Sequence, residues 1–255
     1  MKVATFNVNS LRSRLSIVLN WLEQQKPDIL CLQETKVQDK DFPALSFINT
    51  GYKVVFKGEK SYNGVALISK EKITSINFGF DDGQQRDETR LLFAKVGRVN
   101  IVNSYVPQGR EIEHEMYQYK LNWFKRLRSL FDRHFTPRTP LIWLGDMNVA
   151  PEPIDVYHPE KKENHVCYHE AVRKAFARTK EWGFVDIFRK HHPEPRLYSF
   201  FDYRIPNAVR YRLGWRIDHI LGTGAIAKKS TDAYIDLKPR LGPSPSDHAI
   251  VTAEF

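Results

Sequence analysis

Residues 141–148 read Leu-Ile-Trp-Leu-Gly-Asp-Met-Asn, an apolar run of four residues that gives way to Asp146 and Asn148. A short, uninterrupted apolar run that ends at a glycine is typical of a strand buried on both faces. Polar side chains at the ends of such strands commonly project into one crevice of a sheet and form a site there. We therefore expect Asp146 and Asn148 to lie at one edge of a buried sheet.

The same arrangement, a polar residue at the end of an apolar run, recurs along the chain. Any one example favours a role in a cap or a turn, whereas their repetition favours a common site. The other positions are Asn7 and Asn9 near the first run, Glu34 after residues 29–33, Tyr105 at the end of 101–105, Asp218 and His219 within 215–221, and Asp247 and His248 before the last run.

The alternation of local patterns predicts a mixed α/β fold. Apolar spacing of the helical kind predicts helices at residues 12–25, 113–131 and 168–182. Apolar runs predict strands at residues 2–8, 28–33, 52–57, 64–69, 91–96, 99–106, 140–145, 216–221 and 249–255. The short turn at residues 97–98 predicts a hairpin, which argues against an all-parallel sheet. No linker or repeat divides the chain, so we expect one domain over residues 1–255.

Composition excludes several classes of protein and leaves the partner open. Hydrophobic content of 42% with 27% charged residues is ordinary for a globular chain and excludes disordered, collagen-like and coiled-coil classes. The formal net charge of +9 fits a polyanionic partner such as nucleic acid, and equally a basic but inert surface. The chain has no membrane-length apolar run, no signal-peptide pattern and only two cysteines, of which Cys31 stands in a core run. We expect a cytoplasmic protein without a membrane partner.

The residue types at the strand ends suit hydrolysis of a phosphate ester. Glu34, Asp247 and Asn7 offer the hard oxygen ligands that Mg²⁺ or Mn²⁺ prefers. Asp146 and Asn148, two residues apart, are able to flank one phosphate. No cluster has zinc spacing, and no P-loop, dinucleotide or GxSxG motif is present. His165 and His169 lack the glutamate of a metalloprotease motif and are expected to be surface or turn residues.

The chain resembles the exonuclease III family of apurinic/apyrimidinic endonucleases, within the endonuclease/exonuclease/phosphatase superfamily. Seven segments carry the resemblance in the family's order and span residues 3 to 253, so it covers essentially the whole chain. Each is weak alone, but the ordered set is highly specific. The segments are Phe6-Asn-Val-Asn-Ser-Leu-Arg12, Leu32-Gln-Glu-Thr-Lys36, Tyr62-Asn-Gly-Val-Ala-Leu67, Asn103-Ser-Tyr-Val-Pro-Gln-Gly109, Leu144-Gly-Asp-Met-Asn-Val-Ala-Pro151, Gly214-Trp-Arg-Ile-Asp-His219 and Pro245-Ser-Asp-His-Ala249.

This resemblance implies a four-layer α/β sandwich of the DNase I-like kind, with two packed mixed β-sheets flanked by helices. It implies attack by water on a DNA phosphodiester without a covalent intermediate. The roles implied for the matching residues are Glu34 as the main Mg²⁺ ligand supported by Asn7 and Asp247, Asp146 as the base for water, Asn148 as a contact to the phosphate, Tyr105 as a contact to the phosphate or an aid to the leaving group, and His248 as a phosphate donor oriented by Asp218.

The resemblance also assigns residues to DNA binding. Arg12, Lys36 and Gln108 are expected to contact DNA, and Phe200, Trp215 and Ile217 to line a pocket for a flipped-out abasic sugar. Phe201 and Tyr203 are expected to be core residues instead. Further basic residues near the matched loops are candidates for phosphate contacts. They are Lys57, Lys60, Arg110, Arg189, Arg204 and Arg216.

The implied activity is Mg²⁺-dependent cleavage 5′ to abasic sites by a monomer acting on double-stranded DNA, with 3′→5′ exonuclease and 3′-phosphodiesterase activity as further expectations. Two alternatives remain at this point. One is another phosphodiesterase of the same superfamily, and the other is a catalytically inactive DNA-binding module. The complete set of polar residues at the strand ends argues against the inactive module.

Overall fold

Two mixed six-stranded sheets form the centre of the structure, a computed structural model that describes all residues 1–255. The first sheet has the spatial order β11 (Asp232–Asp236), β12 (Ile250–Glu254), β1 (Lys2–Asn7), β2 (Ile29–Gln33), β4 (Val65–Ser69) and β3 (Lys53–Lys57). The second has the order β5 (Ile73–Phe78), β6 (Leu91–Val96), β7 (Val99–Tyr105), β8 (Leu141–Asp146), β10 (Asp218–Thr223) and β9 (Phe184–Asp186).

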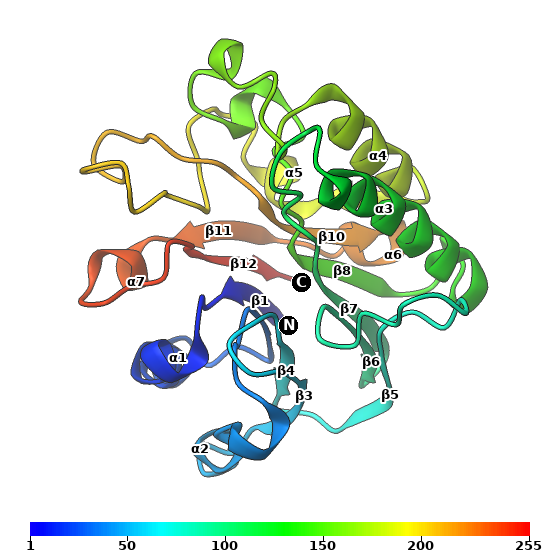
Figure 1. The fold of residues 1–255 in the computed structure, drawn as a ribbon. Helices are drawn as coiled ribbons and strands as arrows, with labels where there is room; N and C mark the ends of the chain where they lie inside the picture. Colours follow the sequence, from blue (N-terminus) through cyan, green and yellow to red (C-terminus); the bar gives the residue numbers. More distant parts are fainter.

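Helices cover the outer face of each sheet, so the expected four-layer sandwich is confirmed (Figure 1). The first sheet carries α1 (Leu11–Gln25) and α2 (Ala44–Ile48), and the second carries α3 (Glu115–His134) and α4 (Glu170–Lys180). Shorter elements fill the connections. They are α5 (Ile187–His191), α6 (Gly224–Ala227), α7 (Lys238–Leu241) and the 3₁₀ turns Asp39–Asp41, Pro153–Asp155 and Pro159–Lys161. None of the helices is long and apolar enough to cross a membrane.

Three layers of apolar side chains hold these elements together. The middle layer packs the two sheets face to face and includes Cys31, Leu67, Ile101 and Leu144, all fully buried. A second layer lies between the first sheet and α1 with α2. The third joins the second sheet to α3 and α4 around Trp143. Burial of both faces of the inner strands explains why they read as continuous apolar runs rather than as alternating ones.

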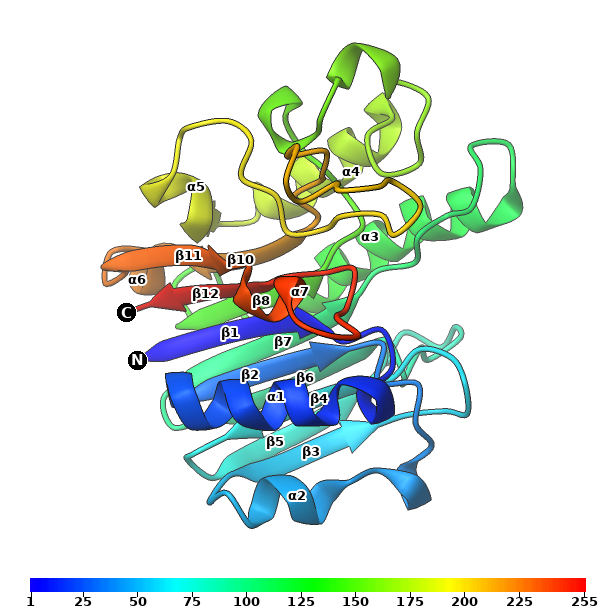
Figure 2. The same ribbon diagram turned by 90° about the vertical axis from the view of Figure 1, so that its left-hand side faces the viewer.

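Parallel and antiparallel pairing together bring several strand ends to one side of the molecule. Strand β1 pairs in parallel with β2, and β7 in parallel with β8, so these four strands end on the same side. Strands β12 and β10 run antiparallel to β1 and β8, so they begin there. Both chain termini lie at the opposite side (Figure 2), where the Phe255 amide donates to the carbonyl of Met1.

Nine strands lie within a few residues of their predicted positions, and three were not predicted. The three are β5, β9 and β11, and each forms the edge of a sheet. An edge strand has little apolar surface to bury, as the single buried residue Ile73 of β5 shows. Its sequence therefore lacks the apolar run by which a central strand is recognised.

Candidate active site

Six polar residues meet at the side where these strands begin and end. Asn7 closes β1 and Glu34 follows β2, both in the first sheet, while Tyr105 and Asp146 close β7 and β8 of the second. Asp218 opens β10 directly opposite Asp146 in the antiparallel register. His248 stands two residues before β12. These strand-end residues thus lie together on one side of the molecule, and they come from both sheets.

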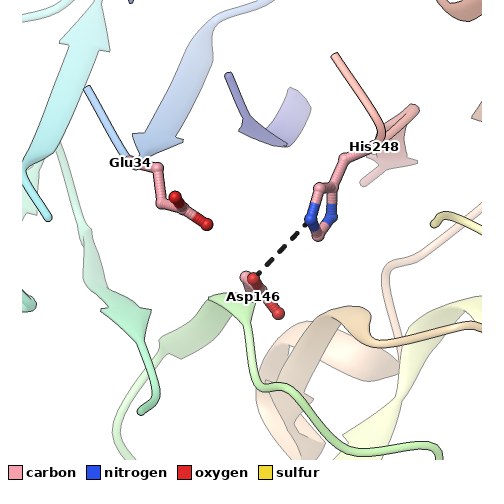
Figure 3. A group of neighbouring side chains, drawn as sticks. All are labelled: Glu34, Asp146 and His248. Atoms are coloured by element: carbon pink, nitrogen blue, oxygen red, sulfur yellow. Dashed lines mark ion pairs between the residues drawn. The ribbon is translucent and has the colours of Figure 1, made fainter. Parts of the chain in front are cut away.

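The centre of this site is formed by Glu34, Asp146 and His248, which point toward one another in Figure 3. One possible ligand atom from each lies within 4.8 Å of the other two. The Nε2 atom of His248 is 3.9 Å from Oδ2 of Asp146, the pair marked by the dashed line. Two carboxylates and one imidazole thus lie close enough together to hold a metal ion.

Asn7 holds the two carboxylates in this position. Its Nδ2 donates to Oε1 of Glu34 at 2.8 Å and to Oδ2 of Asp146 at 2.9 Å. Its side-chain oxygen accepts from the backbone N–H of Asn9 at 3.0 Å. The nitrogen of the fully buried Asn7 side chain therefore faces the site, and the residue acts as a bridge between the sheets.

Glu34 stands in a strained backbone conformation. Its φ of 51° lies in the left-handed region, as does the φ of 53° at Lys36. Such a conformation costs about 1–3 kcal/mol in a residue other than glycine and is found where surrounding contacts impose it. Burial alone would raise the pKa of Glu34, but the Asn7 amide and the Lys36 ammonium, 2.8 Å from Oε2, hold that pKa below its usual range. Glu34 is thus a half-buried carboxylate that is kept in its charged form.

His248 is held by Asp218. Its Nδ1 lies 2.9 Å from Oδ2 of Asp218, and the same carboxylate oxygen accepts from Oγ of Ser199 at 2.6 Å. Burial would lower the pKa of His248, but the neighbouring carboxylates, Asp218 above all, raise it to about 10. The ring is therefore a cation at neutral pH, with Nε2 free to donate into the site. Ser199 was not predicted, because an isolated serine carries no sequence signal.

Asp146 and Asn148 share one tight turn after β8. The backbone N–H of Asn148, whose φ is 50°, donates to Oδ1 of Asp146 at 2.9 Å. The Nδ2 of Asn148 donates to the carbonyl of Val106 at 2.9 Å. Burial, with the charges of Asp218 and Glu34, raises the pKa of Asp146, and the cation of His248 opposes this shift. A carboxylate with a raised pKa is suited to accept a proton from water.

Tyr105 and Asp247 lie at the margins of this centre. The guanidinium of Arg90 lies 4.6 Å from the ring centroid of Tyr105, and burial together with the Glu34 carboxylate raises the pKa of the phenol well above its usual value. Asp247 accepts from Nδ2 of Asn9 at 3.1 Å. Asp247 is not among the three residues whose ligand atoms cluster.

The predicted DNA-binding residues separate into exposed and buried groups. Arg12 and Gln108 are exposed and Lys36 is half-buried beside Glu34. Phe200 is half-buried, with its ring 4.9 Å from that of His248. Trp215 and Ile217 are only 6% and 4% exposed and belong to the core layer under α3 and α4.

One prediction about a loop aromatic residue was wrong. Tyr203 is not core: it is 47% exposed, and its hydroxyl accepts from Arg14 while the guanidinium of Arg240 lies 5.2 Å from its ring. His165 lies in a bend flanked by turns, in line with the surface or turn position predicted for it, and its half-buried ring packs 4.4 Å from that of Trp215. The core expectation for Tyr203 failed because this residue belongs to a loop, whose packing partners lie far away in the chain.

Arg216 does not contact solvent and is unable to reach a DNA phosphate. It is 1% exposed and pairs with Asp155 and Asp186, which Arg189 and His219 join in one buried network. The charge of Arg216 is thereby neutralised inside the protein. The core position predicted for Phe201 is confirmed, because this residue is 2% exposed.

The comparisons with known proteins agree with this geometry. The profile of the Endonuclease/Exonuclease/phosphatase family matches residues 4–248. Exodeoxyribonuclease III of Haemophilus influenzae is 32% identical over 267 residues, covering 100% of both chains.

Two solved structures are similar over nearly the whole of both chains. An AP endonuclease from Archaeoglobus fulgidus has a TM-score of 0.98 and 51% identity, covering 100% of this chain and 99% of that one. A 3′ phosphatase, NExo, from Neisseria, solved with a product DNA hairpin, has a TM-score of 0.93 and 39% identity with the same coverage. With strand ends from two sheets meeting in one acidic centre, the chain belongs to the endonuclease/exonuclease/phosphatase family and is a nuclease of the exonuclease III and AP endonuclease type.

Proposed function

We propose that this protein is a Mg²⁺-dependent DNA repair nuclease that hydrolyses the phosphodiester 5′ to abasic sites, as a single catalytic domain over residues 1–255. One observation carries the proposal: Glu34 and Asp146 face a cationic His248 across a space that both sheets line. Carboxylates for a cation and a charged donor for a phosphate thus meet in one place. The same centre would trim 3′ ends, because that reaction hydrolyses a phosphate ester in the same position.

The donor set fits a hard divalent cation. Oxygen ligands come from Glu34 and Asp247 and, after rotation of its amide, from Asn7, which are the types that Mg²⁺ and Mn²⁺ prefer. His248 is no competitor for the metal, because Asp218 occupies its Nδ1 and keeps the ring protonated. When bound, the metal neutralises charge on the phosphate and stabilises the leaving oxygen. Glu34, the most accessible of the clustered carboxylates, is the main ligand.

The protein groups divide the rest of the reaction. Asp146 orients the attacking water and accepts its proton, while Nδ2 of Asn148 and Nε2 of His248 donate to the non-bridging phosphate oxygens. The hydroxyl of Tyr105 lies beside Glu34 and is assigned a contact to the phosphate or to the leaving oxygen. Water adds to phosphorus as its proton passes to Asp146, the bond to the 3′ oxygen breaks, and that oxygen takes up a proton from solvent. The products are a 3′-hydroxyl and a 5′-deoxyribose phosphate.

A specific observation favours a second candidate, removal of a 3′ phosphate. His165 covers one face of Trp215 at 4.4 Å, and Tyr157 meets that ring edge-on at 6.2 Å. A pocket partly filled in this way has less room for an extrahelical sugar, whereas a terminal phosphate needs no such pocket. The Neisseria relative of known structure is described as a 3′ phosphatase.

A pair of labelled duplexes tests both candidates. One carries a single internal abasic analogue and the other a 3′-terminal phosphate, and each is incubated with Mg²⁺ or with EDTA. Incision at the abasic site only with Mg²⁺ supports the main proposal, and turnover of the 3′ phosphate alone supports the second. The Asp146→Asn variant controls for contaminating nucleases. DNA binding without turnover of either duplex would mean an inactive binding module.

A further inference from the structure

A buried lysine lies directly behind the site. Lys120, in the first half of α3, is 0% exposed. Its Nζ donates to the carbonyls of Gln108 at 3.0 Å, Asn148 at 2.7 Å and Val166 at 2.8 Å. These three contacts use every N–H of the ammonium group.

Lys120 is buried without a carboxylate partner, which is unusual for a residue that serves only to fill the core. Lys120 forms no direct ion pair, and carbonyl oxygens are the only hydrogen-bond acceptors of its ammonium group. Burying an ammonium without a carboxylate partner costs several kcal/mol, which a methionine or leucine at the same place would avoid. A lysine at residue 120 is therefore explained by its three hydrogen bonds and not by the space that its side chain fills.

Each carbonyl belongs to a different loop at the site. Gln108 follows β7 in the loop after Tyr105, Asn148 follows β8, and Val166 lies next to His165 in the segment before α4. These loops are separated by about forty and about twenty residues of chain, yet one ammonium joins them. No other side chain donates to all three.

The loop backbones are shaped to accept this contact. Gly109 has a φ of +102°, and a Cβ there would lie 3.3 Å from Cδ of Lys120. The chain thus passes against the lysine stem, where a side chain would crowd it. Asn148 is in the left-handed conformation, with its amide fixed on the carbonyl of Val106. The lysine contact and this amide contact together determine where the Asn148 side chain lies.

We propose that Lys120 is a positioning residue for the phosphate-binding amide of Asn148, and that it couples this amide to the loop that holds His165 against Trp215. The inference rests on the proposed role of Asn148. Lys120 touches no substrate. It acts by fixing the Asn148 backbone from α3, so that the amide meets the phosphate in the geometry of the transition state.

The first test replaces the ammonium with an apolar chain of similar length, Lys120→Met. We expect kcat on abasic DNA to fall about 100-fold, the size of effect that a misplaced contact of about 1 Å produces, while KM changes little. Leu127→Ala, which changes a buried residue of the same helix that makes none of these three hydrogen bonds, is the matched control and should lower the melting temperature while kcat is retained. Should Lys120→Met not fold, Lys120→Gln keeps part of the hydrogen bonding and should lose kcat to an intermediate extent.

A double-mutant cycle separates positioning from general stability. In single-turnover assays, Lys120→Met should lower the rate strongly in the wild-type background and little in the Asn148→Ala background, because both changes remove the same contribution. Additive effects, or equal loss of kcat in Leu127→Ala, would overturn the inference while leaving the proposed function intact. An Asn148→Ala variant that cleaves at the wild-type rate would instead overturn the proposed role of Asn148 itself.

Discussion

The imidazole of His248 and the carboxylate of Asp218 form a buried pair, with Nδ1 of the ring 2.9 Å from Oδ2 of the acid. The two residues come from the starts of β12 and β10, and therefore from different sheets. The pair sets both the orientation and the charge of the ring, so that Nε2 faces Asp146 as a donor. A protonated imidazole is thus held in the site by residues from both sheets.

Replacement of the protonated His248 ring should slow the reaction without loss of the bound metal ion. We expect His248→Asn to lower kcat about 10²- to 10³-fold, the cost of losing one positioned donor to a developing oxyanion. His134→Asn, which changes the histidine paired with Asp81 at the far end of α3, should leave the rate unchanged. The measurement is single-turnover cleavage at saturating Mg²⁺, and an unchanged rate for His248→Asn would place that residue outside the reaction centre.

Metal removal and a carboxylate change should identify the metal ligand. EDTA should abolish cleavage, and Mg²⁺ or Mn²⁺ should restore it. Glu34→Gln should raise the Mg²⁺ concentration needed for half-maximal rate, because an amide oxygen is a weaker ligand than a carboxylate. Asp28→Asn, at the opposite end of β2, should leave the Mg²⁺ response as it is. Full activity after exhaustive removal of metal would refute the assignment.

The exposed cations should make DNA binding dependent on salt. Affinity should fall steeply between ~50 and ~200 mM salt, because bound lysines and arginines displace counterions from the phosphates. Arg12→Ala should reduce the slope of log affinity against log salt by about 1. Arg128→Ala, on the exposed face of α3 beside Asp132, should not change it. A flat salt response would show that the charge of +9 is not a DNA footprint.

The central strands and the site residues were predictable because burial on both faces leaves a strong apolar signal. Glu34 and Asp146 stand at the ends of such runs and Asp218 opens a strand that runs the opposite way, so that their positions along the strands bring them together. The roles expected for these residues came from the resemblance of the ordered segments to the family. Edge strands such as β5 lack that signal.

Contacts between loops could not be read from the chain in the same way. Arg216 belongs to a basic, matched segment and was expected to contact phosphate, yet Asp155, 61 residues away in the chain, neutralises it in the interior. Lys120 is a charged residue on the buried face of the amphipathic helix α3. Whether a charged side chain faces solvent or a buried partner depends on distant segments, and a local pattern contains no information about them.

Trp215 presents two separable roles. It is 6% exposed within the core layer, and it also lies beside Phe200, to which it is joined by a backbone bridge, and under the ring of His165. The buried surface predicts a loss of about 3–5 kcal/mol in stability on truncation to alanine. The proposed contact with an abasic sugar predicts a separate loss in cleavage of that substrate.

A matched pair of tryptophan variants distinguishes these roles. Trp182→Ala removes a tryptophan of similar burial, 5% exposed, whose Nε1 bonds to Asp132 and whose ring packs on Phe131. Both variants should have a lower melting temperature. Only Trp215→Ala should also lower the ratio of abasic cleavage to 3′-end resection, by ~5- to 150-fold, which corresponds to roughly 1–3 kcal/mol for a lost aromatic contact to a nucleotide. If the two variants show the same ratio, Trp215 is a core residue alone, and the pocket must be formed by other side chains.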